Sequence, residues 1–189
     1  MRLGIVAGAF NPATRAHLAL AGAAGALLDE VVFAIPRTFP HKPLEGASLE
    51  RRVEMLRRAS GHRVEITEGG LLIEIGREAR RWRPEAEVYL VCGRDTAERI
   101  VGWNYEEPDT LERMFEEFHL MVADRQGAYQ PPDHLRARIH ALAMPEDFDD
   151  VSSSEVRRRI AEGEPWEHLI PESIVELVRQ TYAATNAHE

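Results

Sequence analysis

Short apolar runs alternate along this chain with longer segments in which apolar residues recur at helical spacing. The runs are rich in Val, Ile and Leu and are bounded by Gly, Pro or charged residues, which is typical of buried strands. They predict strands at residues 3–7, 30–35, 63–66, 88–92 and 118–123. The run at 88–92 is the most apolar, so we expect it in the middle of a parallel sheet.

The segments between these runs predict helices. The predicted helices cover residues 14–28, 49–59, 71–82, 96–101, 110–117, 152–162 and 173–182. Segment 135–142 predicts a helix or a mixed element that ends in a short strand. In segment 71–82 the apolar residues fall on one stripe, which favours a helix over a strand, although Gly76 weakens that prediction because glycine is a poor helix former.

Strands that alternate with helices indicate an α/β protein with a doubly wound parallel sheet and helices on both faces. The sequence shows no repeat, low-complexity segment or linker, so we expect a single domain over residues 1–189. Ligands of such sheets bind beyond the carboxyl ends of the strands, where the strand order reverses. The loops of interest therefore follow Ala7, Ile35, Cys92 and Ala123.

Composition narrows the class of protein. The formal net charge of -9 argues against a primarily nucleic-acid-binding role. Cys92 is the only cysteine, which excludes a disulfide framework, and its apolar run predicts a buried strand residue. The histidines show no metal-ligand spacing, and no apolar run approaches the ~20 residues of a membrane span. A strand is predicted almost directly after Met1, without a signal-peptide pattern, so we expect a cytoplasmic protein.

The stretch 2–20 predicts a strand, a tight turn and a helix, which is the first half of a βαβ unit. Its turn holds Gly8, Ala9, Phe10 and Asn11, and it points the free N–H groups of a helix N-terminus at an anion site. Thr14 is the expected N-cap, and its hydroxyl can bond a backbone N–H of the first turn. His17 then lies near the positive end of the helix and can donate to a phosphate, although these residues alone favour an ordinary capped helix with a partly exposed histidine.

Two other segments could meet phosphate. Ser152-Ser153-Ser154-Glu155 has a capping-box pattern at a helix start, with Arg157 in the next turn, and so predicts a phosphate cradle or a plain helix cap. Lys42 lies in a loop held by prolines and is either a point charge for phosphate or a surface lysine.

The end of the central strand and the following helix offer two more candidates. Asp95, after Gly93, could bind a ribose hydroxyl or cap the helix, and Trp103 could stack on a ligand ring or be a core residue. The P-loop, dinucleotide-binding and nucleophile-elbow motifs are all missing from the sequence, which speaks against those three classes.

Four motifs in order resemble the nucleotidylyltransferase superfamily, and within it the bacterial nicotinate-mononucleotide adenylyltransferases. The first is GAFNP at 8–12 followed by T-x-x-H at 14–17, similar to the family's G-x-F-[DN]-P and [HT]-x-G-H. The second is PHK at 40–42 ahead of a helix, and the third is GRD at 93–95 with Trp103 eight positions after Asp95. The fourth is VSSSEVR at 151–157, close to I-S-S-T-x-I-R.

The resemblance implies a Rossmann-like nucleotidylyltransferase fold in which the helical part 152–184 completes an ATP site. It implies adenylyl transfer from ATP to nicotinate mononucleotide, with release of pyrophosphate, in NAD biosynthesis. The partners would be ATP and a mononucleotide acceptor, Mg²⁺ would ride on the ATP phosphates without a protein metal site, and a homo-oligomer is possible.

The resemblance also implies residue roles. His17 and Thr14 would contact the transferring and leaving phosphates, while Arg157 and Lys42 would hold phosphates from two sides. Trp103 would stack on the ring of the acceptor. The implied nucleotide-binding residues are Gly8, Ala9, Phe10, Asn11, Gly93, Asp95, Ser152, Ser153 and Ser154.

Two departures from the family pattern leave alternatives open. Ala16 stands where the family has Gly, and GGLLI at 69–73 replaces a Ser-Tyr-Thr motif near the acceptor site. One alternative is another acceptor, such as nicotinamide mononucleotide, pantetheine phosphate or FMN, or CTP as the donor. Others are a weakly active nucleotide-binding homologue and a flavodoxin-like binding module, although such a module has no reason to carry the motif at 151–157.

Overall fold

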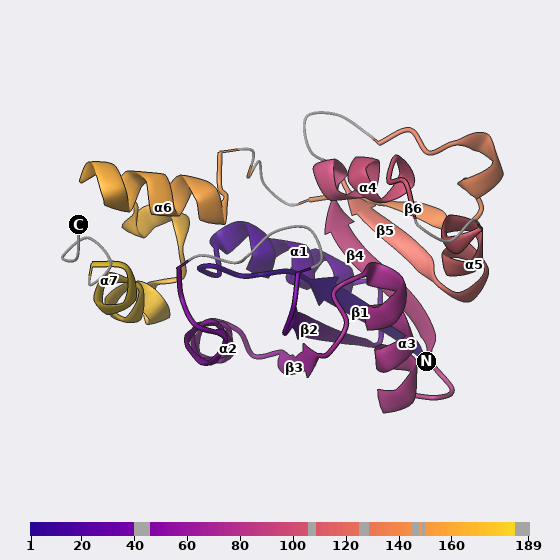
Figure 1. Cartoon of the computed structure of the whole chain (residues 1–189), viewed down its shortest axis with the longest axis horizontal. Helices are drawn as coiled ribbons and strands as arrows, with labels where there is room; N and C mark the ends of the chain where they lie inside the picture. Colours follow the sequence, from indigo (N-terminus) through magenta and orange to yellow (C-terminus); the bar gives the residue numbers. More distant parts are fainter. Residues whose placement is uncertain (40–45, 106–108, 125–128, 145–147, 149, 184–189) are drawn as a thin grey trace.

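The computed structural model describes the chain except residues 40–45, 106–108, 125–128, 145–147, 149 and 184–189. Its six-stranded sheet has the order β3-β2-β1-β4-β5-β6, and every neighbouring pair is parallel (Figure 1). The strands are β1 (Arg2–Ala7), β2 (Glu30–Pro36), β3 (Arg63–Thr67), β4 (Glu87–Gly93), β5 (His119–Ala123) and β6 (Ile139–Leu142).

Helices cover both faces of the sheet, as the alternation of elements predicted. They are α1 (Arg15–Gly25), α2 (Leu49–Ala59), α3 (Leu72–Trp82), α4 (Arg94–Val101), α5 (Thr110–Glu117), α6 (Ser153–Glu162) and α7 (Val175–Ala183). Short 3-10 turns lie at Asp133–Leu135, Glu167–Leu169 and Glu172–Ile174. One core cluster joins the sheet to α1, α2 and the C-terminal helices, and a second joins it to α3, α4 and α5.

Successive residues of a strand belong to different core clusters. In β2, Phe33 belongs to the first cluster, whereas Val32 and Ala34 belong to the second. Because successive side chains of a strand point to opposite faces, a strand covered on both faces must be apolar throughout. This is why the strands were recognisable as continuous apolar runs, and β4 lies in the middle of the sheet as predicted.

The segment 71–82 is a helix, and the structure explains Gly76. A Cβ at Gly76 would lie 2.8 Å from the ring of Phe118, which is 1% exposed. Glycine is therefore required there by the close approach of α3 to a core ring, at a cost in helix propensity.

The larger differences from the predicted boundaries concern three helices. Helix α4 begins at Arg94 directly after β4, so Gly93 ends the strand and caps the helix instead of forming a turn. Segment 135–142 is a mixed element that ends in the short strand β6, as predicted, and β6 pairs with the outer edge of β5. Helix α1 ends at Gly25, and the last helix begins at Val175 after a 3-10 turn.

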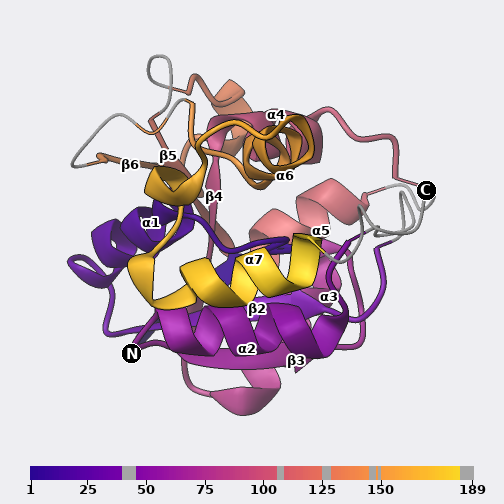
Figure 2. The same cartoon turned by 90° about the vertical axis from the view of Figure 1, so that its left-hand side faces the viewer.

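The strand order reverses at the centre of the sheet, between β1 and β4. The C-terminal helices pack beside this point: α7 contacts α2 and α6, and Figure 2 shows α7 alongside α2. The chain's last described helix thereby reaches the loop that follows its first strand.

Candidate active site

The loop after β1 is anchored in the core by an aromatic side chain. Phe10 is 1% exposed, has a positive φ of 47°, and packs edge-on against Phe33 and His17 at ring-centroid distances of 5.3 and 5.0 Å. The N–H of Gly8 donates to the carbonyl of Ala34 at 3.1 Å. A left-handed φ is unfavourable for a bulky residue, so the buried ring must hold it.

Asn11 connects this loop to α2 and α7. Its side chain is 2% exposed, and its Oδ1 accepts hydrogen bonds from the N–H of Ala47 (3.1 Å) and from the hydroxyl of Tyr182. Burial raises the pKa of Tyr182, so its phenol stays protonated and remains a donor. The Asn11 side chain therefore faces the protein interior.

Arg52 holds the neighbouring backbone. Its guanidinium is buried and donates from Nη1 to the carbonyl of Ala9 at 3.0 Å and from Nε to the carbonyl of Ala47 at 3.2 Å. Burial lowers the pKa of Arg52 from its ordinary value. A buried guanidinium that bonds two carbonyls fixes the relative position of the two loops.

His17 has a defined tautomer. Thr14 is the N-cap of α1, its backbone N–H donates to His17 Nδ1 at 3.0 Å, and its Oγ1 lies 2.8 Å from the same nitrogen. A backbone N–H can only donate, so Nδ1 must be the acceptor and carry no proton. In the neutral ring the proton is then on Nε2, which can act as a donor.

The N-terminus of α6 meets the same loop from the other end of the chain. Ser153 Oγ donates to the carbonyl of Pro12 at 2.7 Å, and Arg157 Nη1 donates to the carbonyl of Asn11 at 2.5 Å. Ser152 is the N-cap, and its Oγ accepts from a first-turn N–H at 3.1 Å. The two helix N-termini singled out in the sequence are thus joined in the structure.

The capping box predicted for α6 is only half formed. The carboxylate of Glu155 hydrogen-bonds Arg158 and Arg159 instead of the N-cap N–H, and those two guanidinium groups lower the pKa of Glu155 to about 2. The cations nearby are stronger partners for a carboxylate than a neutral N–H is.

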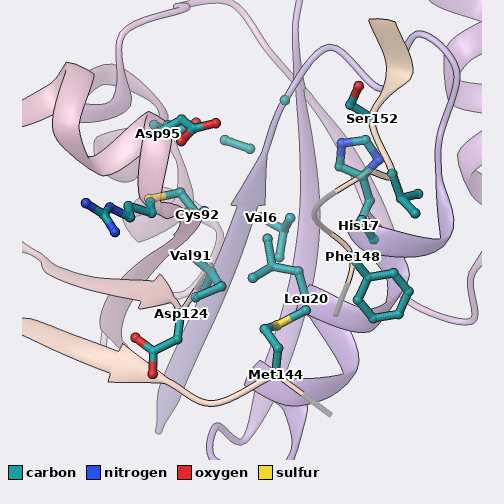
Figure 3. A pocket seen from close by; sticks show the side chains of 18 of the residues that line it. Val6, His17, Leu20, Val91, Cys92, Asp95, Asp124, Met144, Phe148 and Ser152 are labelled. Carbon is teal, nitrogen blue, oxygen red and sulfur yellow. The ribbon is translucent and has the colours of Figure 1, made fainter. Parts of the chain in front are cut away.

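A cavity of about 710 Å³ lies at the carboxyl ends of β1, β4 and β5, beside the first turn of α1 and the start of α6 (Figure 3). Its size is within the range of small-molecule and cofactor sites. Six predicted residues line it: Gly8, His17, Gly93, Asp95, Ser152 and Ser153. Val6, Leu20, Val91 and Met144 add an apolar part to its wall.

The remaining predicted residues lie elsewhere. Thr14, Phe10 and Asn11 are buried and do not line the cavity, and Ala9 and Ser154 adjoin lining residues in the chain without lining it themselves. Arg157 does not line the cavity either, and it contacts the Asn11 carbonyl and Ser154. Trp103 follows α4, is 43% exposed and does not line the described cavity. Lys42 lies outside the described residues.

Both departures from the family pattern can be placed. Ala16 lines the cavity, with its methyl group beside His17. Segment 69–73 turns into α3: Gly69 N–H donates to Glu78 at 3.1 Å and Leu71 N–H to Glu74 at 2.9 Å. No residue of this segment is among those that line the described cavity.

Sequence reasoning did not single out three residues at this site: Arg52, Tyr182 and Asp124. Asp124 lines the cavity, and its position directly after a predicted strand was the available signal. Cys92 was predicted to be buried and is 7% exposed, and burial raises the pKa of its thiol to about 12, so it stays protonated at neutral pH. In the described part of the chain, no helix is long and apolar enough to cross a membrane.

Comparisons with known proteins identify the family of the chain. A family model described as cytidylyltransferase-like matches residues 5–159. A probable nicotinate-nucleotide adenylyltransferase from Gloeobacter violaceus is 33% identical, over 95% of this chain and 94% of that protein. One of the same name from Moorella thermoacetica is 30% identical, over 94% of this chain and 89% of that protein.

A solved structure shares the fold. The nicotinic acid mononucleotide adenylyltransferase of Plasmodium falciparum, complexed with NaAD, superposes with a TM-score of 0.72 over 98% of this chain and 96% of that chain. The two sequences are 17% identical.

Proposed function

The chain belongs to the cytidylyltransferase-like family, and from this premise we propose that it transfers the adenylyl group of ATP to nicotinate mononucleotide in NAD biosynthesis. Pyrophosphate is the second product. The observation that carries this proposal is that the N-terminus of α6 is joined to the loop before α1 beside one cavity. Arg157 donates a hydrogen bond to the carbonyl of Asn11, and Ser153 donates one to the carbonyl of Pro12. Helix N-termini favour anions, and the reaction brings a triphosphate and a monophosphate together.

The reaction requires the two phosphate-bearing substrates to be positioned and the charge of the transition state to be stabilised. The acceptor phosphate attacks the α-phosphorus of ATP in line, the bond to the β-phosphate oxygen breaks, and pyrophosphate leaves with that electron pair. No protein nucleophile is required, which agrees with the protonated state of Cys92. Donors aimed at the transferring phosphate lower the barrier most, because charge builds up there.

We assign to His17 the role of stabilising the charge that builds up on the transferring phosphate. Because Nδ1 accepts from Thr14, the neutral ring carries its proton on Nε2, and we propose that this N–H donates to a phosphate in the cavity that the ring lines. We propose that Arg157 and the N–H groups near Ser153 and Ser154 hold the ATP phosphates, and that Lys42 approaches them from the loop outside the described residues.

The sugar and ring contacts are the other part of the proposal. Asp95 is placed to accept from a ribose hydroxyl because it lines the cavity in the first turn of α4. Trp103 would stack on the acceptor ring. A divalent cation, which we propose is Mg²⁺, would arrive on the ATP phosphates and keep several waters. Among the described residues, no group of three histidine, cysteine or acidic side chains is placed to hold a metal.

The acceptor is tested with a pyrophosphate-release panel. ATP and CTP are each offered with nicotinate mononucleotide, nicotinamide mononucleotide, phosphopantetheine and FMN. We expect the highest kcat/KM for ATP with nicotinate mononucleotide. Because segment 69–73 departs from the family pattern, a higher value for another acceptor would reassign the substrate while leaving the transfer chemistry in place.

A variant pair tests the role of His17. We expect His17→Ala to lower kcat by about 10²-fold or more, because one donor to a developing charge is typically worth that much. The matched control is His134→Ala, an exposed histidine in the 3-10 turn Asp133–Leu135, which should keep wild-type turnover. Thermal unfolding checks that both variants fold, and wild-type turnover by His17→Ala would refute the assignment.

A further inference from the structure

Asp124 is a carboxylate at the cavity that the proposed chemistry does not use. It follows the last residue of β5, and its backbone N–H donates to the carbonyl of Leu142 on β6 at 3.0 Å. That bond extends the pairing of the two strands, so the sheet fixes the base of the side chain. Figure 3 shows Asp124 beside Val91, across the cavity from His17 and Ser152.

One oxygen of this carboxylate has no partner. Oδ1 of Asp124 is buried and makes no hydrogen bond within the described part of the chain, where Ser60 Oγ is the only other buried side-chain atom in that condition. Leaving a buried acceptor unpaired is costly, so such an atom at a cavity wall indicates a donor that arrives with the ligand. A carboxylate at neutral pH only accepts, which fixes the chemistry of the matching ligand group as an N–H or O–H.

The polarity of the wall indicates which part of a nucleotide meets Asp124. His17, Ser152 and the start of α6 form the side that favours phosphate. The apolar side chains Val91 and Met144 lie toward Asp124 (Figure 3). If the triphosphate occupies the first side, the flat apolar base extends along the second, with its edge at the carboxylate.

We propose that Asp124 selects the donor base by accepting a hydrogen bond from its exocyclic amino group. This inference rests on the proposed function and deepens it, because it assigns the recognition of ATP to a named atom. A single unpaired oxygen suits the one amino group of adenine, whose neighbouring ring nitrogen is itself an acceptor. A base with a carbonyl at that position would place two acceptors against each other.

The test compares two donors in four proteins, with GTP as a third donor for the wild type. ATP is compared with purine riboside triphosphate, which differs from ATP only in lacking the 6-amino group. The proteins are the wild type, Asp124→Ala, Asp124→Asn and the control variant Asp95→Asn, which changes the other carboxylate among the described residues that line the cavity. Both kcat/KM from pyrophosphate release and Kd from calorimetry are measured for each pair.

We expect the wild type to favour ATP by about 10- to 100-fold, the range for a hydrogen bond to a charged group. Asp124→Ala should bring this ratio close to one, and Asp124→Asn should give an intermediate ratio because its amide oxygen still accepts. Asp95→Asn should weaken both donors equally and leave the ratio unchanged, since ribose is common to both. The cycle isolates the pairing of Asp124 with the amino group from any general loss of function.

Three results would overturn the inference. The first is a wild type that uses both donors equally, which decides the matter even if the variants fail to fold. The second is an unchanged ratio in folded Asp124→Ala, which would move the role of the carboxylate to the ribose hydroxyls. The third is a preference for GTP over ATP, because the ring N–H and the amino group of guanine would then face the carboxylate. Calorimetric preference for ATP without any turnover would count against the proposed function alone and support the role of Asp124.

Discussion

The hydroxyl of Tyr182 is expected to control both stability and activity, because it joins the last described helix to the loop after β1. It donates to Asn11 Oδ1, which also accepts from Ala47 at 3.1 Å. Tyr182→Phe removes this one bond and keeps the ring. Since Asn11 Oδ1 retains its second donor, we expect a loss of about 1 kcal/mol in the free energy of unfolding, the value of one buried hydrogen bond, without a further penalty for an unpaired acceptor.

The effect on activity follows from what Asn11 holds. Its carbonyl accepts from Arg157, so a shift of this loop moves the guanidinium that we propose contacts the ATP phosphates. We expect kcat/KM for ATP to fall about 10-fold, because misplacement of a reacting group by a fraction of an ångström is costly. The control is Thr181→Val on the same helix, whose hydroxyl donates only to the carbonyl of Leu177 at 2.7 Å. Urea unfolding and pyrophosphate release are measured on all three proteins, and a destabilised Tyr182→Phe with wild-type kcat/KM would refute the reasoning.

Three further predictions concern glycines of α1 and α3, His119 at the start of β5, and the arginines of α6. Gly22→Ala, which meets nothing within 4 Å, should raise the free energy of unfolding by about 1 kcal/mol, whereas Gly76→Ala should not, since overpacking against a buried ring costs about 1–3 kcal/mol. Equal stabilisation in urea unfolding would contradict the packing argument. Burial, followed by the nearby arginine charge, lowers the pKa of His119 below its ordinary 6.5, so the unfolded state binds more protons and stability should decrease as pH falls below about 6.5. His119→Gln should flatten the decrease measured between pH 7.5 and 5.5, and an unaltered slope would exclude this origin. Arg157→Ala should raise the KM for ATP, whereas Arg158→Ala, which pairs with surface glutamates, should not; equal KM values in steady-state kinetics would remove Arg157 from the ATP site.

The fold could be predicted from the sequence because its determinants are local. A strand covered on both faces must be apolar at every position, so β1, β2 and β4 were visible as short runs. Helix α3 was recognisable from its stripe despite Gly76. The start of α4 was not, because Gly93 serves both as the last strand residue and as the helix cap, and glycine after a strand usually indicates a turn.

The site was predictable only where a local pattern coincided with a cavity. His17 and Ser152 open helices and could be found by their caps. The buried role of Asn11 depends on Tyr182, which is 171 positions away, and the role of Arg52 depends on a backbone carbonyl in another loop. Burial and long-range pairing of this kind leave no periodic signal, and Asp124 became a candidate only when its unpaired oxygen was located at the cavity.

The central claim is that adenylyl, and not phosphoryl, is transferred to a pyridine mononucleotide. It is tested most directly by incubating the enzyme and nicotinate mononucleotide with ATP labelled at either the α- or the γ-phosphate. We expect the α-label to appear in the dinucleotide product and the γ-label in pyrophosphate. A γ-label found on the acceptor, or an α-label that never leaves ATP, would contradict it.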